Sequence, residues 1–478
     1  MKRTVLVEVV AIAALMSTAA CKQGHSPLDD TTAKTAPAPG DLPAAIDKIA
    51  DDVLAETGCP SASLAAVKDG KIIYVHAYGK ARLASGSGAD TPATPQMRYS
   101  IGSIAKQMTA TAILLLLQDG KLALDDTVGK YVPGITGGDI VTIRQVLSHT
   151  AGYRDYAPQD YIIPEWLKPT TPNTIVERFG RAALDFEPGT KWQYSNTGFV
   201  IAGMIVEKVA DKPLFAFLEE RVFDKLGMAS AVDVDRGSLA PTDPQGYFRR
   251  ANGPPHPAPV EGAGWRLGAY ELGMTAEDLA KWDIALIDRK ILTPALTKIL
   301  GTETLLSNGA GTHYGLGIAV TLVDQHRQLG HGGESSGFVS ENLVLPDDKI
   351  AVAVLTNQDA SPAARRIATK VRDALLRAAD PNGNADEHVS KLLAELSQGR
   401  IDRSQLTANA NAYFSDEAIG EYRDAIGAAG RFERVEQTSS GRRGGYMTRR
   451  YQAKYATKTL ELSVFETDDG KIEQFLIE

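Results

Sequence analysis

The chain has 478 residues, more than one ordinary hydrophobic core accommodates, so we expect two or three domains. Hydrophobic residues make up 43% and charged residues 23% of it, which is the composition of a globular protein. A formal net charge of −8 argues against nucleic acid as the main partner, because a nucleic-acid-binding protein would carry a basic face.

The N-terminus has the order of a targeting segment. Lys2 and Arg3 precede a mostly apolar run that ends in small residues just before Cys21. This order resembles a bacterial lipoprotein signal, although Glu8 and Thr18 depart from it. We therefore expect residues 1–20 to be a signal peptide, Cys21 to be lipidated, and the protein to be exported to the periplasm or cell envelope. Simple secretion after cleavage and a retained anchor are the alternatives.

Residues 21–40 lack apolar side chains to bury and are expected to form a flexible tether. From 42 to 56 the apolar spacing predicts a helix. Two short apolar runs then flank Asp69-Gly70, which is a hairpin signal. A strong helix is predicted at 103–117. Further helices are expected at 142–148, 174–183, 197–210, 214–225, 276–287 and 365–378, and strands at 314–322, 328–330, 338–345 and 350–355.

This order places strands at both ends of a region with helices between them. It predicts an α+β fold in which distant segments complete one antiparallel sheet and helices pack on it. We assign residues 41–380 to this domain. The turn-rich stretch 381–385 then leads into a second domain, 381–478. Helices at 387–396 and 416–428 followed by three strand-like stretches indicate a small α+β domain, which resembles a cystatin- or NTF2-like fold.

Two motifs supply nucleophilic chemistry. Ser103-Ile-Ala-Lys106 places a serine and a lysine three residues apart, so both can face one cleft from a helix. A lysine can accept the serine proton if its pKa is lowered. Tyr194-Ser-Asn196 places a phenol and an amide on one side of an extended segment. The phenol can relay protons, and the amide can bind substrate and Lys106. A core tyrosine followed by an asparagine that caps a helix is the structural alternative.

A third motif, His331-Gly332-Gly333, precedes a predicted strand, and glycine permits close approach of a ligand to the backbone. The backbone N–H groups of Glu334 and Ser103 are candidate oxyanion donors. His313-Tyr-Gly315 is a weaker candidate for the same role, because it begins a run that is predicted to be an ordinary strand. His149, near a predicted helix end, is expected to be structural.

The order and spacing of these motifs resemble the serine β-lactamase and penicillin-binding protein superfamily. The class C-like branch, with D-aminopeptidases and family VIII esterases, is the most similar. Further stretches at 147–152, 186–190, 226–228 and 275–279 support it. The resemblance implies that Ser103 is acylated, that Lys106 and Tyr194 move protons, and that Asn196 orients Lys106 and substrate. His331 stands where many members have lysine, so the grip on a substrate carboxylate should be weaker.

The resemblance therefore implies a serine hydrolase with an acyl-enzyme on Ser103. Its substrates would be small esters or D-amino-acid peptides and amides, with β-lactams turned over slowly. We expect neither a metal nor a cofactor. The alternative is a binding protein on the same fold that recognises cell-wall peptides or β-lactams without turnover. The sequence leaves the oligomeric state open.

A competing motif is Gly333-Glu-Ser335-Ser-Gly337, which matches the nucleophile elbow of α/β-hydrolases. That elbow requires a strand before the serine and a helix after it. Here a strand is predicted after it, so we favour Ser103.

Overall fold

The computed structural model describes residues 42–84, 88–159, 161–323, 326–379 and 385–478. The predicted signal peptide, Cys21 and the predicted tether lie outside these residues. Among the helices of the described ranges, none is both long and apolar enough to cross a membrane.

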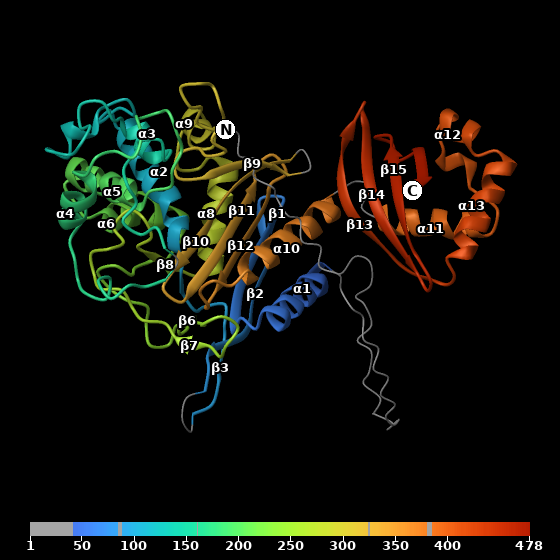
Figure 1. Cartoon of the computed structure of the whole chain (residues 1–478), viewed down its shortest axis with the longest axis horizontal. Helices are drawn as coiled ribbons and strands as arrows, with labels where there is room; N and C mark the ends of the chain where they lie inside the picture. The colour runs from blue at the N-terminus through green and yellow to red at the C-terminus, as the bar shows by residue number, and fades with distance from the viewer. Residues whose placement is uncertain (1–41, 85–87, 160, 324–325, 380–384) are drawn as a thin grey trace, which may run out of the picture. The chain divides into compact units, whose positions relative to one another are not determined.

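A seven-stranded antiparallel sheet forms the centre of the part from 42 to 379 (Figure 1). Its order is β3-β2-β1-β12-β11-β10-β9, so strands from the beginning and the end of this part meet in its middle. The expected α+β fold with a sheet completed by distant segments is confirmed. The strands are β1 (Ser61–Lys68), β2 (Lys71–Arg82), β3 (Thr91–Pro92), β9 (Ala319–Val323), β10 (His326–Ser335), β11 (Phe338–Leu345) and β12 (Ile350–Thr356).

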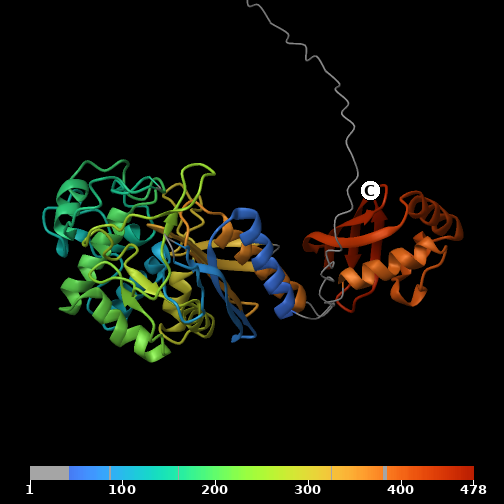
Figure 2. The same ribbon diagram turned by 90° about the horizontal axis from the view of Figure 1, so that it is seen from below.

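Helices cover both faces of this sheet. On one face, α1 (Leu42–Thr57) and α10 (Ala363–Ala379) pack together and share a core with β1, β11 and β12. The opposite face carries α8 (Ala276–Asp288), and the helical block that includes α2 (Ala105–Gln118) lies on that side. Figures 1 and 2 show the sheet and the helices on its two faces from perpendicular directions. Every residue of β12 is buried because both of its faces are covered.

The helical block lies in the chain between the strands β4 (Tyr99–Ser100) and β8 (Leu272–Met274). The helices predicted at 174–183 and 214–225 are interrupted by π-helical turns, η3 and η4. The sequence analysis missed α9. Besides α2, the elements of the block are α3 (Ile143–Leu147), α4 (Pro172–Ile175), η3 (Val176–Gly180), α5 (Asn196–Ala210), α6 (Leu214–Leu218), η4 (Glu219–Phe223) and α7 (Asp224–Leu226), whereas α9 (Pro294–Leu300) follows α8 in the chain.

A chain of buried hydrogen bonds fixes α2 against the sheet. The indole N–H of Trp282 donates to Gln107 Oε1 at 2.9 Å, and Gln107 Nε2 donates to Asn342 Oδ1 at 3.0 Å. Asn342 Nδ2 then donates to Asp283 Oδ1 at 2.7 Å. Burial raises the pKa of Asp283 to about 8, while its bond from Asn342 opposes this. Gln107 follows Lys106 directly, so these hydrogen bonds also fix the position of Lys106 on α2.

Two strand predictions need correction. The strand expected at 314–322 is confined to β9, because Gly317 adopts a left-handed φ of 71°. A Cβ at Gly317 would lie 2.5 Å from the carbonyl oxygen of Lys106, so glycine is needed there. The strand expected at 328–330 is much longer. β10 runs through His331-Gly332-Gly333, which therefore forms part of a strand instead of preceding one.

Residues from 385 onward build a separate hydrophobic cluster of their own. A four-stranded antiparallel sheet in the order β13-β14-β15-β16 contributes to it together with helices. The prediction of two helices and three strands was one short in each case. The elements are α11 (Ala385–Ser397), α12 (Ala408–Tyr413), α13 (Asp416–Ala428), β13 (Phe432–Arg443), β14 (Tyr446–Tyr455), β15 (Thr459–Glu466) and β16 (Ile472–Ile477).

Candidate active site

Ser103 lies in a single 3₁₀ turn, η1 (Gly102–Ile104), directly before α2. Gly102 has a left-handed φ of 55°, and a Cβ on it would lie 2.4 Å from the backbone nitrogen of Glu334. A Cβ on Gly333 would lie 2.0 Å from the carbonyl oxygen of Ile101. Glycine is therefore required on both segments, and this close approach places Ser103 beside β10.

Lys106 is completely buried, and its ammonium group has three acceptors. It donates to Ser103 Oγ at 3.0 Å, to Asn196 Oδ1 at 2.8 Å and to the carbonyl oxygen of Ala269 at 2.9 Å. Burial lowers the pKa of Lys106 to about 7, although the charge of Asp155 opposes this. A substantial fraction of Lys106 is therefore an uncharged amine at neutral pH, and it can accept the hydroxyl proton of Ser103.

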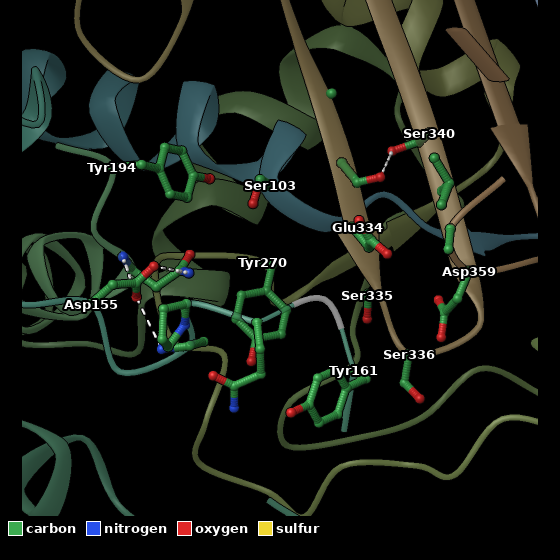
Figure 3. Close-up of a pocket in the computed structure, with 18 of the residues that line it drawn as sticks. Ser103, Asp155, Tyr161, Tyr194, Tyr270, Glu334, Ser335, Ser336, Ser340 and Asp359 are labelled. Carbon is green, nitrogen blue, oxygen red and sulfur yellow. Dashed lines mark hydrogen bonds between the residues drawn. The ribbon is translucent and has the colours of Figure 1, made fainter. Parts of the chain in front are cut away.

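Tyr194 directs its hydroxyl toward Ser103 (Figure 3). The ammonium nitrogen of Lys106 lies 4.9 Å from the centre of the tyrosine ring. Burial raises the pKa of Tyr194 well above its usual value; the contact with Ser103 opposes this and the charge of Asp155 adds to it. The phenol therefore remains protonated at neutral pH. It can supply a proton to a leaving group, while Lys106 is the better placed base.

Asn196 is held by Asp155, a residue that the sequence analysis missed. The carboxylate accepts the backbone N–H of Asn196 at 3.0 Å and its Nδ2 at 3.2 Å. This leaves Oδ1 of Asn196 directed at Lys106. Burial raises the pKa of Asp155, with backbone N–H groups and the Lys106 charge opposing. No motif marks a lone aspartate in the 153–166 loop, so only the folded chain reveals its contact.

His149 holds the segment that carries Tyr194 from both sides. Its carbonyl oxygen accepts the N–H of Gln193 at 2.9 Å, and its Nδ1 accepts the N–H of Ser195 at 3.1 Å. Its ring centre lies 4.3 Å from that of Tyr194. Burial, followed by the charges of Lys106 and His331, lowers the pKa of His149 well below its usual value. A neutral imidazole is required, since protonated Nδ1 could not accept the Ser195 N–H.

His331 lies on β10, and its ring centre is 6.1 Å from that of Tyr194. Its Nε2 lies 2.8 Å from the hydroxyl of Tyr314, and its Nδ1 contacts the carbonyl oxygen of Gly332. Burial, together with the charge of Lys106, lowers the pKa of His331 to about 4, and the contact with Gly332 opposes this. The imidazole is therefore neutral at physiological pH. It cannot provide a fixed positive charge for a substrate carboxylate.

His313-Tyr-Gly315, the weaker alternative to the His331 motif, does not bring its histidine to the site. His313 is largely exposed and lies 3.3 Å from Glu303, whereas its neighbour Tyr314 reaches the site through His331. The sequence analysis missed Tyr314.

The outer edge of β10 faces the cleft beyond Gly330. β9 pairs with β10 from His326 only as far as Gly330, whereas β11 pairs with it as far as Ser335. The stretch from His331 to Ser335 also lines the cleft. An extended substrate could therefore add to this edge as a further strand, with the N–H groups of Ser103 and Glu334 near its carbonyl.

The cleft has a volume of about 1090 Å³. Ser103, Tyr194, Asn196 and the segment 331–334 all line it, and Lys106 lies directly beneath Ser103. The structure thus brings together every predicted site residue except Cys21, which lies outside the described residues. The 153–166 loop lines the cleft with the apolar and aromatic side chains of Tyr161, Ile162 and Trp166 as well as with Arg154 and Asp155.

Ser335 does not form a nucleophile elbow. It ends β10, and Ser336-Gly337 turns the chain directly into β11. Strand–turn–strand geometry does not place a helix N-terminus behind the hydroxyl, as the α/β-hydrolase elbow requires. The preference for Ser103 over Ser335 is therefore supported.

Comparison with known proteins agrees with this geometry. The family model described as Beta-lactamase matches residues 46–376. The chain is 26% identical over 330 residues to penicillin-binding protein 4* of Bacillus subtilis, covering 66% of this chain and 70% of that protein. It is also 26% identical over 309 residues to D-aminopeptidase of Brucella anthropi, covering 62% of this chain and 56% of that protein. The chain therefore spans only about half of the length of that second relative.

Among solved structures, the chain is similar to D-amino acid amidase from Ochrobactrum anthropi complexed with L-phenylalanine amide. The TM-score is 0.61 at 26% sequence identity, and the match covers 72% of this chain and all of that one. Ser103, Lys106 and Tyr194 all lie within residues 46–376, the range that the family model matches. The chain belongs to the β-lactamase family and is a serine hydrolase of that family.

Proposed function

We propose that the protein is an exported hydrolase that forms an acyl-enzyme on Ser103 with small esters or with peptides and amides of D-amino acids. The observation that carries this proposal is the hydrogen bond between Ser103 and the completely buried Lys106. A lysine with a pKa near 7 can act as a base at neutral pH, whereas an ordinary lysine cannot.

Each step then has a residue in place. Lys106 accepts the Ser103 proton while Ser103 Oγ bonds to the substrate carbonyl carbon. The N–H groups of Ser103 and Glu334 stabilise the oxyanion. Tyr194 gives its proton to the departing amine or alcohol as the bond to the carbonyl breaks, and it regains a proton from Lys106. Water then hydrolyses the acyl-enzyme.

The substrate class is supported by two features. A penicillin presents a carboxylate, and the neutral His331 offers it no cation. The names of two relatives, a D-aminopeptidase and a D-amino acid amidase, point to amides of D-amino acids. We infer that esters and D-amino acid amides are hydrolysed faster than β-lactams.

The test is covalent labelling with a fluorophosphonate and a fluorescent penicillin, followed by intact mass. We expect fluorophosphonate labelling that is lost in Ser103→Ala and retained in the matched control Ser335→Ala. Loss in Ser335→Ala alone would contradict the assignment. Acylation that gives a burst without steady turnover would instead identify a binding protein on the same fold.

Export rests on the sequence features of residues 1–21 alone. We propose that Cys21 is lipidated after removal of residues 1–20. The full chain should then partition with membranes and carry an acyl mass increment, and Cys21→Ser should lose both. A Cys21→Ser protein that still partitions with membranes would favour a retained anchor.

A further inference from the structure

The side-chain amide of Asn196 lies between Asp155 and Lys106. Asp155 Oδ1 accepts the backbone N–H groups of Ala157 at 3.1 Å and Asn196 at 3.0 Å, and its Oδ2 accepts Asn196 Nδ2 at 3.2 Å (Figure 3). An ionised carboxylate only accepts hydrogen bonds, so the NH2 group of Asn196 must face it. The amide oxygen, Oδ1, must then face Lys106. Asp155 therefore determines which way this amide points.

The acceptors around Lys106 determine where its lone pair points. An uncharged lysine amine has two N–H donors and one lone pair. Lys106 Nζ lies 2.8 Å from Asn196 Oδ1 and 2.9 Å from the carbonyl oxygen of Ala269. Both oxygens only accept hydrogen bonds, so they occupy the two N–H groups. The lone pair is left for the third neighbour, Ser103 Oγ at 3.0 Å, whose proton it can accept.

Lys106 becomes a buried cation when it takes this proton. Its side chain is completely buried, and an isolated buried charge is costly. Three further titratable groups lie beside it, and none of the three supplies a negative charge: burial keeps the phenol of Tyr194 protonated and the imidazoles of His149 and His331 neutral. The carboxylate whose charge favours the ammonium form is Asp155.

The surroundings of Asp155 suit this role. Burial raises the pKa of Asp155, but the N–H groups of Ala157 and Asn196 and the charge of Lys106 oppose this rise. The N–H donors stabilise the ionised carboxylate, and a positive Lys106 stabilises it further. The negative charge of Asp155 is thus favoured most in the step that makes Lys106 positive.

We propose that Asp155 is a positioning residue of the reaction, which acts on Lys106 in two ways. Through the amide of Asn196 it directs the lone pair of Lys106 at Ser103, and with its charge it balances the ammonium group that forms. The hydroxyl proton ends on Lys106 Nζ, while the electron pair of the broken O–H bond stays on Ser103 Oγ, which bonds to the substrate carbonyl carbon. The inference rests on the proposed function, because it concerns the base of the acylation step.

The test measures the second-order rate of fluorophosphonate labelling of Ser103 against pH in the full chain. The probe carries neither an amino group nor a carboxylate, so the rate does not depend on recognition of a charged substrate. Asp155→Asn removes the charge that favours the ammonium form of Lys106. The midpoint of the pH profile should therefore move to lower pH, by about one pH unit. The plateau rate should fall about 10-fold, because the base is weaker and less well aligned.

Two further variants separate the charge from the fold. Asp155→Glu keeps the charge, so it should keep the wild-type midpoint even though its longer side chain lowers the plateau. Asp185→Asn is the matched control, because Asp185 also lines the cleft but is paired with Arg154 at 2.7 Å, and its midpoint should not move. Circular dichroism reports folding. If Asp155→Asn does not fold, the smaller uncharged variant Asp155→Ser takes its place, with the same shift expected.

A lowered midpoint in the uncharged variant together with a wild-type midpoint in Asp155→Glu would support the inference. An uncharged variant that folds and keeps the wild-type midpoint, or moves it upward, would overturn it, because a residue that only supports the loop would change the rate alone. Labelling of Ser103 in the wild type would then leave the proposed function standing. A wild-type protein that is not labelled at Ser103 would remove both.

Discussion

The two walls of the cleft are built in opposite ways. On the helical side, Lys106, Asn196 and Asp155 form a continuous series of buried hydrogen bonds, and each donor of the Lys106 ammonium group has an acceptor. On the β10 side the strand edge beyond Gly330 is not covered by β9, and carboxylates gather at its end. The contrast separates two tasks. A satisfied network fixes the geometry of the reacting groups, while an open and charged edge selects the substrate.

The largest expected effect comes from removing the base on the helical side. Lys106→Met keeps the length of the side chain but provides no proton acceptor. We expect kcat/KM for an ester substrate to fall by about 10³-fold, within the range for loss of general base catalysis. Circular dichroism and thermal unfolding serve as folding controls. A variant that folds and keeps more than a tenth of wild-type activity would contradict the role of Lys106.

A smaller effect is expected when the support of Tyr194 is loosened. His149→Phe keeps an aromatic ring but loses the acceptor for the Ser195 N–H, whereas His149→Asn can retain an acceptor there. We expect kcat to fall about 10-fold in His149→Phe with little change in KM, because misplaced catalytic groups slow the chemical step. His149→Asn should recover part of the loss. Equal loss in both variants would mean that ring packing, and not the hydrogen bond, positions Tyr194.

A change at Asp283, which lies on α8 beneath the site, should affect activity least but stability clearly. Asp283 has a folded pKa of about 8, above its unfolded value, so the folded state binds the extra proton. Stability should therefore fall as pH rises from about 4 to about 8, by at most about 1.4 kcal/mol per pH unit. Asp283→Asn should make this slope shallower in urea unfolding and be more stable than wild type at pH 8.

Asp288→Asn, an exposed change at the end of the same helix, is the matched control and should leave the slope in place. If Asp283→Asn shows the wild-type slope, another buried acid is responsible for it.

On both walls of the cleft the sequence predicts residues that lie close together in the chain, and it misses residues that distant loops bring to the site. Ser103 and Lys106 can be predicted from the sequence because helical spacing alone brings them to one face. Tyr194 and Asn196 can be predicted because they stand on either side of one residue in an extended segment. Asp155 and His149 act through contacts made by distant loops, which no spacing rule reports. The length of β10 was misjudged because glycines usually end strands. Here Gly333 is needed inside the strand, where the carbonyl oxygen of Ile101 leaves no room for a Cβ.

The proposed mechanism depends on the lowered pKa of Lys106, which the pH dependence of Ser103 labelling measures. The second-order rate of fluorophosphonate labelling should rise with pH through a single midpoint near 7 and then level off, because only the uncharged amine accepts the serine proton. The midpoint should disappear in Lys106→Met. A rate that is independent of pH between about 5 and 9, or that rises only toward the usual lysine pKa of about 10.4, would mean that Lys106 is not the base that activates Ser103.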